Sequence, residues 1–419
     1  MRRRTTRDSI DSDEDLALTR RLSRRTFLGG AAAAVGAAFL AGCAPGTSPG
    51  PASPSGSATP SIGPAPTDSP AAPSPTEGLS LREVIAGLIV VGFRGFTVAT
   101  AGPVVDSIAK ERLAGVILFN RDQAKGSLRN IQSPAQVKAL TAGLQKLAGA
   151  RRLIVSIDQE GGQVARLNPT NGYPAMASEA AIGEADNATT TLKWGQTIAK
   201  ALADSGINLN FAPVVDLNVN PTNPAIGALD RSFAANPTIV TNLSRIEIGA
   251  HHARGVATTL KHFPGLGSAT VNTDFGVSDV TDTWRRTELE PYRSLIESGD
   301  ADVIMAGHLV NRNLDPTYPA SLSTAIVTDL LRGELGWDGV VVTDSLGAVA
   351  ITSKFGKAEA IALAIEAGND LLLFANQGTY DPDLATHVID IVEAHVTSGR
   401  ISRERLEESR ARIERLWPG

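Results

Sequence analysis

The feature that most constrains the fold is a unit repeated along the chain: a short apolar run, a polar residue at its end, then a helical stretch. The apolar runs are Leu88–Phe93, Gly115–Phe119, Leu153–Asp158, Asn208–Asp216, Val256–His262, Ala301–His308, Gly339–Asp344 and Asp370–Phe374. The runs are continuously apolar rather than alternating, which is typical of strands covered on both faces, as in a parallel sheet. Between them lie stretches with apolar residues at three- and four-residue spacing, for example Thr324–Leu335 and Lys357–Ala367, which predict helices.

Eight such units in about 340 residues favour an α/β protein built as a (β/α)8 barrel of the TIM type. We expect one catalytic domain over residues 79–419, with two helices in about Leu384–Trp417 closing the barrel. An open, doubly wound sheet is the alternative. No Gly-x-Gly-x-x-Gly motif follows the first run, which disfavours a dinucleotide-binding function.

Polar residues at the carboxyl ends of barrel strands converge on one mouth. Those residues are Asn120, Arg121, Asp158, Asp216, Lys261, His262, His308 and Asp344. A single aspartate after a strand is more often a helix cap or a turn former than a catalyst. Carboxylates and cationic donors on several strands together favour a site, and this chemistry suits a neutral, polyhydroxylated substrate.

Several segments, in this order along the chain, resemble motifs of bacterial β-N-acetylglucosaminidases of glycoside hydrolase family 3. They are Asp158–Arg166 (DQEGGQVAR), Asn210–Asp216 (NFAPVVD), Arg231–Phe233 (RSF), Lys261–Gly265 (KHFPG) and Val342–Leu346 (VTDSL). The segments fall at predicted strand ends across most of the predicted domain. Each is moderate evidence alone, and the ordered set is strong evidence.

The resemblance implies a retaining hydrolase that removes terminal β-linked N-acetylhexosamine, such as GlcNAc of cell-wall or envelope glycans, without a cofactor. It implies that Asp344 is the nucleophile and forms a covalent glycosyl-aspartate. The residues implied to hold the sugar hydroxyls are Asp158, Arg166, Arg231, Lys261 and His262. A Schiff-base role for Lys261, as in barrel aldolases, is an alternative that would require a lowered pKa.

One loop departs from the family pattern. After K-H-F-P-G these enzymes usually continue H-G-x-x-x-x-D-S-H, in which the last His is the acid/base; here Leu266–Asp274 reads LGSATVNTD. Asn272 replaces the Asp and Asp274 replaces the His, so Asp274 is the candidate acid/base. Glycines bracket the loop and predict a mobile backbone. A phosphorylase or transferase, or a sugar-binding lipoprotein with weak catalysis, remain alternatives.

Residues 1–43 read as a targeting segment. Arg24 and Arg25 form a twin-arginine pattern, and the apolar run Phe27–Ala41 is too short to span a bilayer comfortably. The run ends in Leu40–Cys43, which resembles a bacterial lipobox. We therefore expect export, and lipid anchoring through Cys43 to the outer face of the cytoplasmic membrane.

Residues 44–78 are almost wholly Pro, Ser, Ala, Gly and Thr, which predicts a disordered tether.

The net charge of −5 argues against nucleic acid as a partner. With one Cys the chain has no internal disulfide, and its six His show no metal-ligand spacing, so we expect no metal. We expect a monomer whose partners are a carbohydrate substrate and, through the anchor, the membrane.

Overall fold

The computed structural model describes residues 76–417. The targeting segment, Cys43 and nearly all of the predicted tether lie outside the described residues, so their predictions stay as predictions. Within the described part of the chain, no helix has the length and apolarity needed to cross a membrane.

The described domain is built on parallel strands that match the eight predicted runs. They are β1 Ile89–Gly92, β2 Gly115–Leu118, β3 Ile154–Ile157, β6 Leu209–Asn210, β7 Thr259–Phe263, β8 Val303–Ala306, β9 Val340–Thr343 and β10 Leu372–Phe374. They form two parallel sheets, of order β10-β1-β2-β3-β6 and β7-β8-β9. A short antiparallel hairpin, β4 Gln159–Gly161 with β5 Val164–Ala165, follows β3 and was not predicted.

Helices connect the strands. The α-helices are α1 Leu81–Ala86, α2 Val104–Lys110, α3 Pro134–Ala148, α4 Glu179–Ala185, α5 Ala188–Asp204, α6 Pro237–His252, α7 Glu290–Glu297, α8 Val349–Thr352, α9 Lys357–Ala367, α10 Leu384–Thr397 and α11 Arg403–Glu414. A π-helix, η6 Ala325–Glu334, fills the predicted helical stretch before β9, and 3-10 turns are η1 Val98–Thr100, η2 Pro169–Asn171, η3 Gly227–Leu229, η4 Arg286–Leu289 and η5 Ala320–Leu322. The two helices expected after the last strand are α10 and α11.

Local sequence signals explain where the longer helices begin. The side chains of Ser133, Asn187, Asn236 and Ser402 each accept a hydrogen bond from a backbone amide in the first turn of α3, α5, α6 and α11. Such caps satisfy amides that have no partner inside the helix. A proline follows the cap in α3 and α6, where its missing amide hydrogen costs nothing.

Isolated parallel bridges join the two sheets at both edges. Leu209 pairs with Ala257 and Val214 pairs with Lys261 between the β6 and β7 segments, and Val342 pairs with Leu371 between the β9 and β10 segments. The predicted strand Asn208–Asp216 was too long, because regular pairing stops after Asn210. Pro213 has no amide hydrogen and interrupts the ladder.

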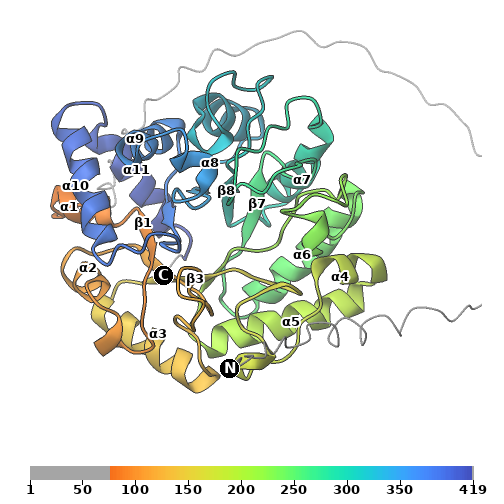
Figure 1. The fold of residues 1–419 in the computed structure, drawn as a ribbon, viewed down its shortest axis with the longest axis horizontal. Coiled ribbons are helices and arrows are strands. Elements are labelled where there is room, and N and C mark those ends of the chain that lie inside the picture. The colour runs from red at the N-terminus through yellow and green to blue at the C-terminus, as the bar shows by residue number, and fades with distance from the viewer. Residues whose placement is uncertain (1–75, 418–419) are drawn as a thin grey trace, which may run out of the picture. The chain divides into compact units, whose positions relative to one another are not determined.

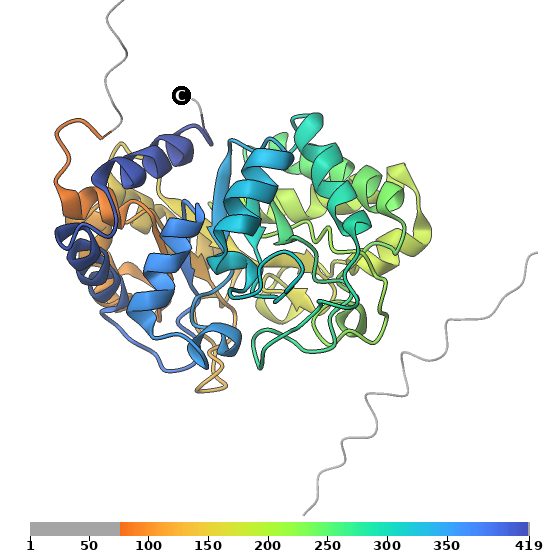
Figure 2. The same ribbon diagram turned by 90° about the horizontal axis from the view of Figure 1, so that it is seen from above.

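The elements follow one another around the molecule, with the helices outside the strands (Figure 1). The two ends of the domain meet, since β1 pairs with β10 and the orange and blue segments lie side by side in both ribbon views (Figure 2). All residues of β1, β2, β3, β7, β8, β9 and β10 are buried, and their apolar side chains belong to one core cluster shared with the inner faces of the helices. This packing places the polar strand ends at one face of the domain.

Candidate active site

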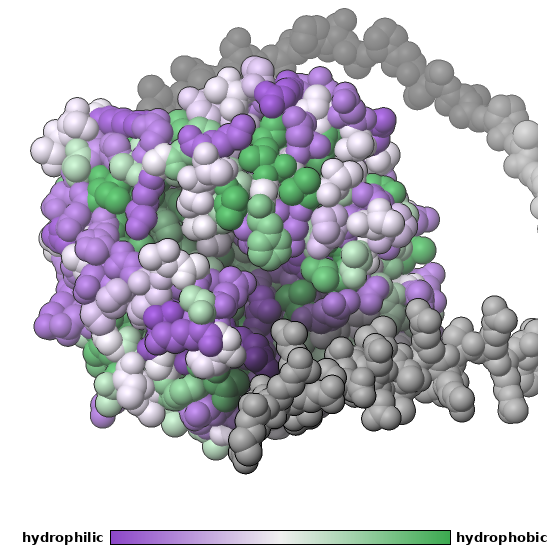
Figure 3. All heavy atoms as spheres, viewed as in Figure 1, coloured by the Kyte–Doolittle hydropathy of each residue, from purple (hydrophilic) through white to green (hydrophobic). Residues whose placement is uncertain are grey.

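A pocket of about 1000 Å³ lies where the strands end. The residues predicted to catalyse the reaction or hold the sugar all line it: Asp158, Arg166, Arg231, Lys261, His262, Asp274 and Asp344. The face seen in Figure 1 is hollowed near its middle, with hydrophilic side chains at the hollow and hydrophobic ones on part of its rim (Figure 3). Among residues 76–417 no group of three or more His, Cys, Asp and Glu side chains could hold a metal ion.

The floor of the pocket is a buried network of opposite charges centred on Glu160, whose exposed fraction is only 1 %. Arg231 donates two hydrogen bonds to the two carboxylate oxygens of Glu160, from Nε at 2.7 Å and from Nη2 at 2.8 Å. The Nζ of Lys261 lies 2.6 Å from Oε1 of the same carboxylate. Burial pushes the pKa of Glu160 upward, but the charges of Arg231 and Lys261 outweigh burial and hold the pKa well below its ordinary range.

Sequence reasoning gave Glu160 no role, although it stands two residues after Asp158. The hairpin β4–β5 turns the chain back directly after β3, and this turn places the Glu160 carboxylate in the pocket floor. The sequence did offer one sign of it: three polar side chains, Asp158 to Glu160, stand in a row where the predicted strand ends.

The network extends from Glu160 to Asp158. Lys261 donates a hydrogen bond of 3.0 Å to Asp158, and Arg166 lies 3.4 Å from the other oxygen of that carboxylate. Burial alone would lower the pKa of Lys261, but Glu160 and Asp158 raise it above its ordinary value. Because Lys261 therefore stays an ammonium ion, the geometry disfavours the Schiff-base alternative, which requires a neutral amine.

An irregularity in β7 explains how neighbouring residues both reach the pocket. Successive side chains of a regular strand point to opposite faces. The pairing of β7 with β8 shifts register between Leu260 and Phe263, and Lys261 and His262 lie within this interval. Such a shift re-aims side chains, and both of them line the pocket.

Asp216 is wholly buried and orients His262 instead of lining the pocket. Its carboxylate lies 2.7 Å from Nδ1 of His262 and accepts the backbone amides of His262 at 3.1 Å and Leu266 at 2.7 Å. This contact assigns the Nδ1 proton of His262 to the bond with Asp216. The other ring nitrogen, Nε2, is 3.5 Å from Nη2 of Arg231 and faces the substrate site.

Asp344 follows β9 directly. Its backbone amide donates to Ala306 at 2.9 Å, and its Oδ1 accepts the amide of Ser345 at 2.7 Å. Burial would raise the pKa of Asp344. The electrostatic influence of His308 and His262, together with the Ser345 amide, outweighs burial and holds this pKa below 3.8, its ordinary value. Asp344 is therefore an anion at neutral pH.

His308 is buried behind the Asp344 turn, although the sequence placed it at the pocket mouth. Its Nε2 lies 2.9 Å from the carbonyl oxygen of Ser345, and its Nδ1 lies 2.7 Å from Oγ of Ser321. Because a carbonyl only accepts, Nε2 carries the proton. His308 therefore supports the turn that presents Asp344.

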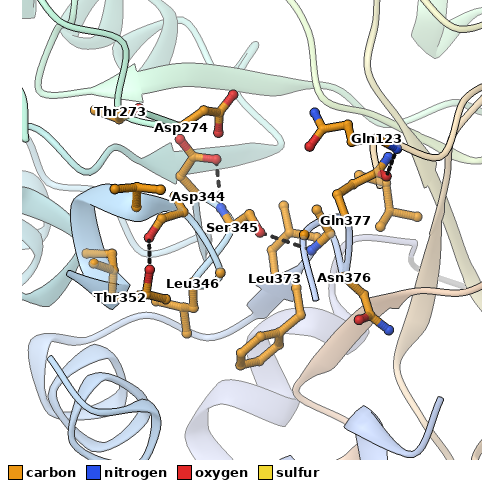
Figure 4. Close-up of a pocket in the computed structure, with 18 of the residues that line it drawn as sticks. Gln123, Thr273, Asp274, Asp344, Ser345, Leu346, Thr352, Leu373, Asn376 and Gln377 are labelled. Carbon is orange, nitrogen blue, oxygen red and sulfur yellow. Dashed lines mark hydrogen bonds between the residues drawn. The ribbon is translucent and has the colours of Figure 1, made fainter. Parts of the chain in front are cut away.

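Asp274 lies on the loop between β7 and α7, and its side chain shares the pocket with Asp344 (Figure 4). Enclosure by the pocket walls raises the pKa of Asp274, and the charge of Asp344 raises it further. The side chain is open to solvent, which limits the rise. The two carboxyl groups thus have pKa values displaced in opposite directions, as a proton donor and an anionic nucleophile require.

Hydrogen bonds anchor the loop that carries Asp274 in this structure, and its predicted mobility stays a prediction. The amide of Ala350 donates to the carbonyl of Thr273 at 3.1 Å, and the side chain of Asn272 accepts the amide of Asp274 at 2.9 Å. Near the start of the loop, the side chain of Asn223 donates to the carbonyls of Leu266 and Gly267. The bonds from Ala350 and Asn223 are made by residues far away in the sequence, whereas the bond between Asn272 and Asp274 is local.

Asn120 and Arg121, predicted at the mouth, do not line the pocket. Arg121 instead pairs with Leu128 within the segment after β2 and donates from Nη1 to the carbonyl of Gly126. In the segment after β2 the pocket is lined by Phe119 and Gln123 instead.

Comparisons with known proteins agree with this geometry. The sequence profile of the Glycosyl hydrolase family 3 N terminal domain matches residues 80–416. Beta-hexosaminidase A of Pseudoalteromonas piscicida is 34 % identical over 332 residues, which cover 74 % of this chain and 54 % of that protein. A beta-hexosaminidase of Xylella fastidiosa (strain M23) is 33 % identical over 314 residues, covering 73 % of this chain and 87 % of that protein.

Solved structures give a similar result. A glycoside hydrolase family 3 beta-N-acetylglucosaminidase from Paenibacillus sp. str. FPU-7 has a TM-score of 0.74 and 36 % identity, covering 81 % of this chain and 62 % of that one. Beta-N-acetylhexosaminidase from Beutenbergia cavernae DSM 12333 has a TM-score of 0.70 and 32 % identity, covering 80 % of this chain and 98 % of that one. The chain thus spans about half of the Pseudoalteromonas protein and nearly all of the Beutenbergia one.

Proposed function

Because this chain belongs to glycosyl hydrolase family 3, we propose that it is a retaining β-N-acetylhexosaminidase acting on terminal N-acetylhexosamine of envelope glycans. The observation that carries the proposal is the pair of carboxyl groups in one pocket. Asp344 is held as an anion by its surroundings, while the pKa of Asp274 is raised. The beta-hexosaminidase names of the relatives support the choice of sugar.

In the first step the carboxylate of Asp344 attacks the anomeric carbon, and the bond to the leaving oxygen breaks. Asp274 donates its proton to that oxygen, so the leaving group departs as a neutral alcohol. In the second step Asp274, now a carboxylate, takes a proton from water. The water oxygen attacks the anomeric carbon and releases Asp344 from the covalent glycosyl-aspartate.

The charged floor would hold the sugar during both steps. Asp158 keeps oxygen atoms that can accept hydroxyl protons, and Arg166 lies beside it at the pocket wall. Arg231 and Lys261 offer donors fixed by their bonds to Glu160, and His262 offers a ring nitrogen fixed by its bond to Asp216. Because these side chains are already oriented, binding need not order them at the moment of reaction.

We further propose that the eight strands close into a barrel of the TIM type. The bridges at both edges of the two sheets support this closure, as does the pairing of β1 with β10. In such barrels active sites lie at the carboxyl ends of the strands, which is where this pocket is found.

We propose that the domain acts outside the cytoplasmic membrane as a monomer held by a lipid on Cys43. Arg24 and Arg25, the lipobox-like run before Cys43 and the Pro/Ser-rich stretch behind it support this proposal. The acidic net charge argues against nucleic acid as a partner.

A panel of chromogenic β-glycosides, assayed with and without phosphate, tests the activity. The proposal expects release of N-acetylhexosamine from its β-glycosides without any need for phosphate. Formation of a sugar phosphate would favour a phosphorylase, and transfer to added sugars in place of hydrolysis would favour a transferase. Binding of the sugar without turnover would favour a sugar-binding lipoprotein.

A further inference from the structure

Phe275 stands out among the apolar side chains of the described chain. Its exposed fraction is 76 %, whereas that of every other large hydrophobic side chain in residues 76–417 is at most 48 %. It also lines the pocket directly after Asp274 in the sequence. A phenyl ring held in water at the mouth of a pocket is a typical mark of a binding surface.

Two exposed valines belong to the Phe275 loop and to the segment that is hydrogen-bonded to it. Val271 and Val349 are 38 % and 42 % exposed, and Val349 also lines the pocket. The hydrogen bond from the amide of Ala350 to the carbonyl of Thr273 ties their two segments together. We call Val271, Phe275 and Val349 the apolar rim.

The position of the apolar rim relative to the two carboxyl groups assigns it to one side of the cleaved bond. The charged residues that would hold the terminal sugar lie on the pocket floor, and Glu160 and Lys261 there are almost fully buried. The leaving group must lie outward from them, beside the residue that protonates it. Phe275 is next to that residue in the sequence, lines the same pocket and is 76 % exposed.

We propose that Phe275 is the platform for a sugar ring on the leaving-group side of the cleaved bond, so that the natural substrate is an oligosaccharide or glycan chain end. The inference rests on the proposed function and specifies its substrate class. A pyranose presents C–H groups on its faces and hydroxyls around its edge. Its C–H face can pack on the electron-rich face of a phenyl ring while its hydroxyls stay in water.

The anchoring of the loop supports this role. Asn272 accepts the amide of Asp274 with its side chain and the amides of Phe275 and Gly276 with its carbonyl. These bonds hold the backbone that carries Phe275 in a defined turn, and a platform ordered in advance loses little entropy on binding.

The test compares two glycosides of the same terminal N-acetylhexosamine. One is a β-linked disaccharide, and the other is the trifluoroethyl glycoside, whose leaving alcohol is about as acidic as a sugar hydroxyl but contains no ring. For Phe275→Ala we expect kcat/KM to fall about tenfold on the disaccharide, from the loss of buried apolar contact, and less than twofold on the trifluoroethyl glycoside. Phe275→Tyr should keep both activities.

Leu192→Ala is the matched control, since Leu192 is 41 % exposed on α5 and does not line the pocket. It should leave kcat/KM unchanged on both substrates. Equal losses on the two substrates in Phe275→Ala, or no loss on the disaccharide, would overturn this inference alone. If the parent protein cleaves neither of the two glycosides, both the proposed function and this inference are overturned.

Discussion

Replacing Glu160 by Gln tests whether the charged pocket floor is organised as described. The substitution keeps the shape of the side chain but removes the charge that faces Arg231 at 2.7 and 2.8 Å and Lys261 at 2.6 Å. Removing one partner of a buried ion pair typically costs about 3–5 kcal/mol, because the other charge stays buried without compensation. We therefore expect the free energy of unfolding at pH 7 to fall by about 3–5 kcal/mol.

The matched control is Glu359→Gln on the surface. Glu359 binds Arg400 through two hydrogen bonds of 2.6 and 2.9 Å, a geometry close to that of Glu160 with Arg231, but its side chain is 49 % exposed. Exposed pairs contribute about 0–1 kcal/mol. Urea unfolding followed by circular dichroism compares both variants with the parent protein.

The pH dependence gives a second check on Glu160. Its pKa is lowered in the folded protein, so its stabilisation is fully present above its ordinary value of 4.5 and is lost as the pH falls through the folded value. The stability gap between parent and Glu160→Gln should stay constant from neutral pH down to pH 5 and narrow only below that. If Glu160→Gln loses no more stability than Glu359→Gln, Glu160 is not a buried partner of Arg231 and Lys261. The same follows if the difference in stability between parent and Glu160→Gln disappears near neutral pH.

Three further predictions concern catalysis and placement. Asp274→Ala should slow glycosides with poor leaving groups far more than activated aryl glycosides, and azide should rescue the activated ones; equal loss on both in steady-state assays would remove Asp274 from the mechanism. The pH profile of kcat/KM should be bell-shaped, since Asp344 must be ionised and has a lowered pKa while Asp274 must be protonated and has a raised one. The alkaline limb should vanish in Asp274→Ala. Cys43→Ser should release the protein into the medium or wash fraction, as followed by immunoblots of the cell fractions. If the variant stays in the membrane fraction as the parent protein does, Cys43 does not carry a lipid anchor.

The sequence was sufficient for the elements that depend on local patterns. Each apolar run contains a strand of the described domain, because burial on both faces imposes continuous apolarity whatever the distant contacts are. The run Asn208–Asp216 shows the limit: it is largely apolar up to its end, but its regular strand covers only Leu209–Asn210, and Pro213 cannot donate a ladder hydrogen bond. Periodicity does not report hydrogen bonding.

The site was predicted less completely, because several of its features depend on contacts between distant segments. Glu160 is placed by a hairpin that the pattern did not suggest, and its partners Arg231 and Lys261 are far away in the sequence. The glycines around Asp274 gave no sign of the bond from Ala350 to Thr273, which joins the loop to the segment after Asp344. The identities of such partners follow from the fold and not from local composition.

The central claim is that Asp344 forms the covalent bond to the sugar. Incubation with a slow fluorinated N-acetylhexosamine glycoside, followed by proteolysis and mass spectrometry, identifies the residue that carries the trapped sugar. Asp344→Asn is the companion variant: it should keep the fold and lose turnover by several orders of magnitude, because an amide cannot act as the anionic nucleophile. We expect a single labelled peptide with the sugar on Asp344; a label on Asp158 or Asp216 would instead make that residue the nucleophile.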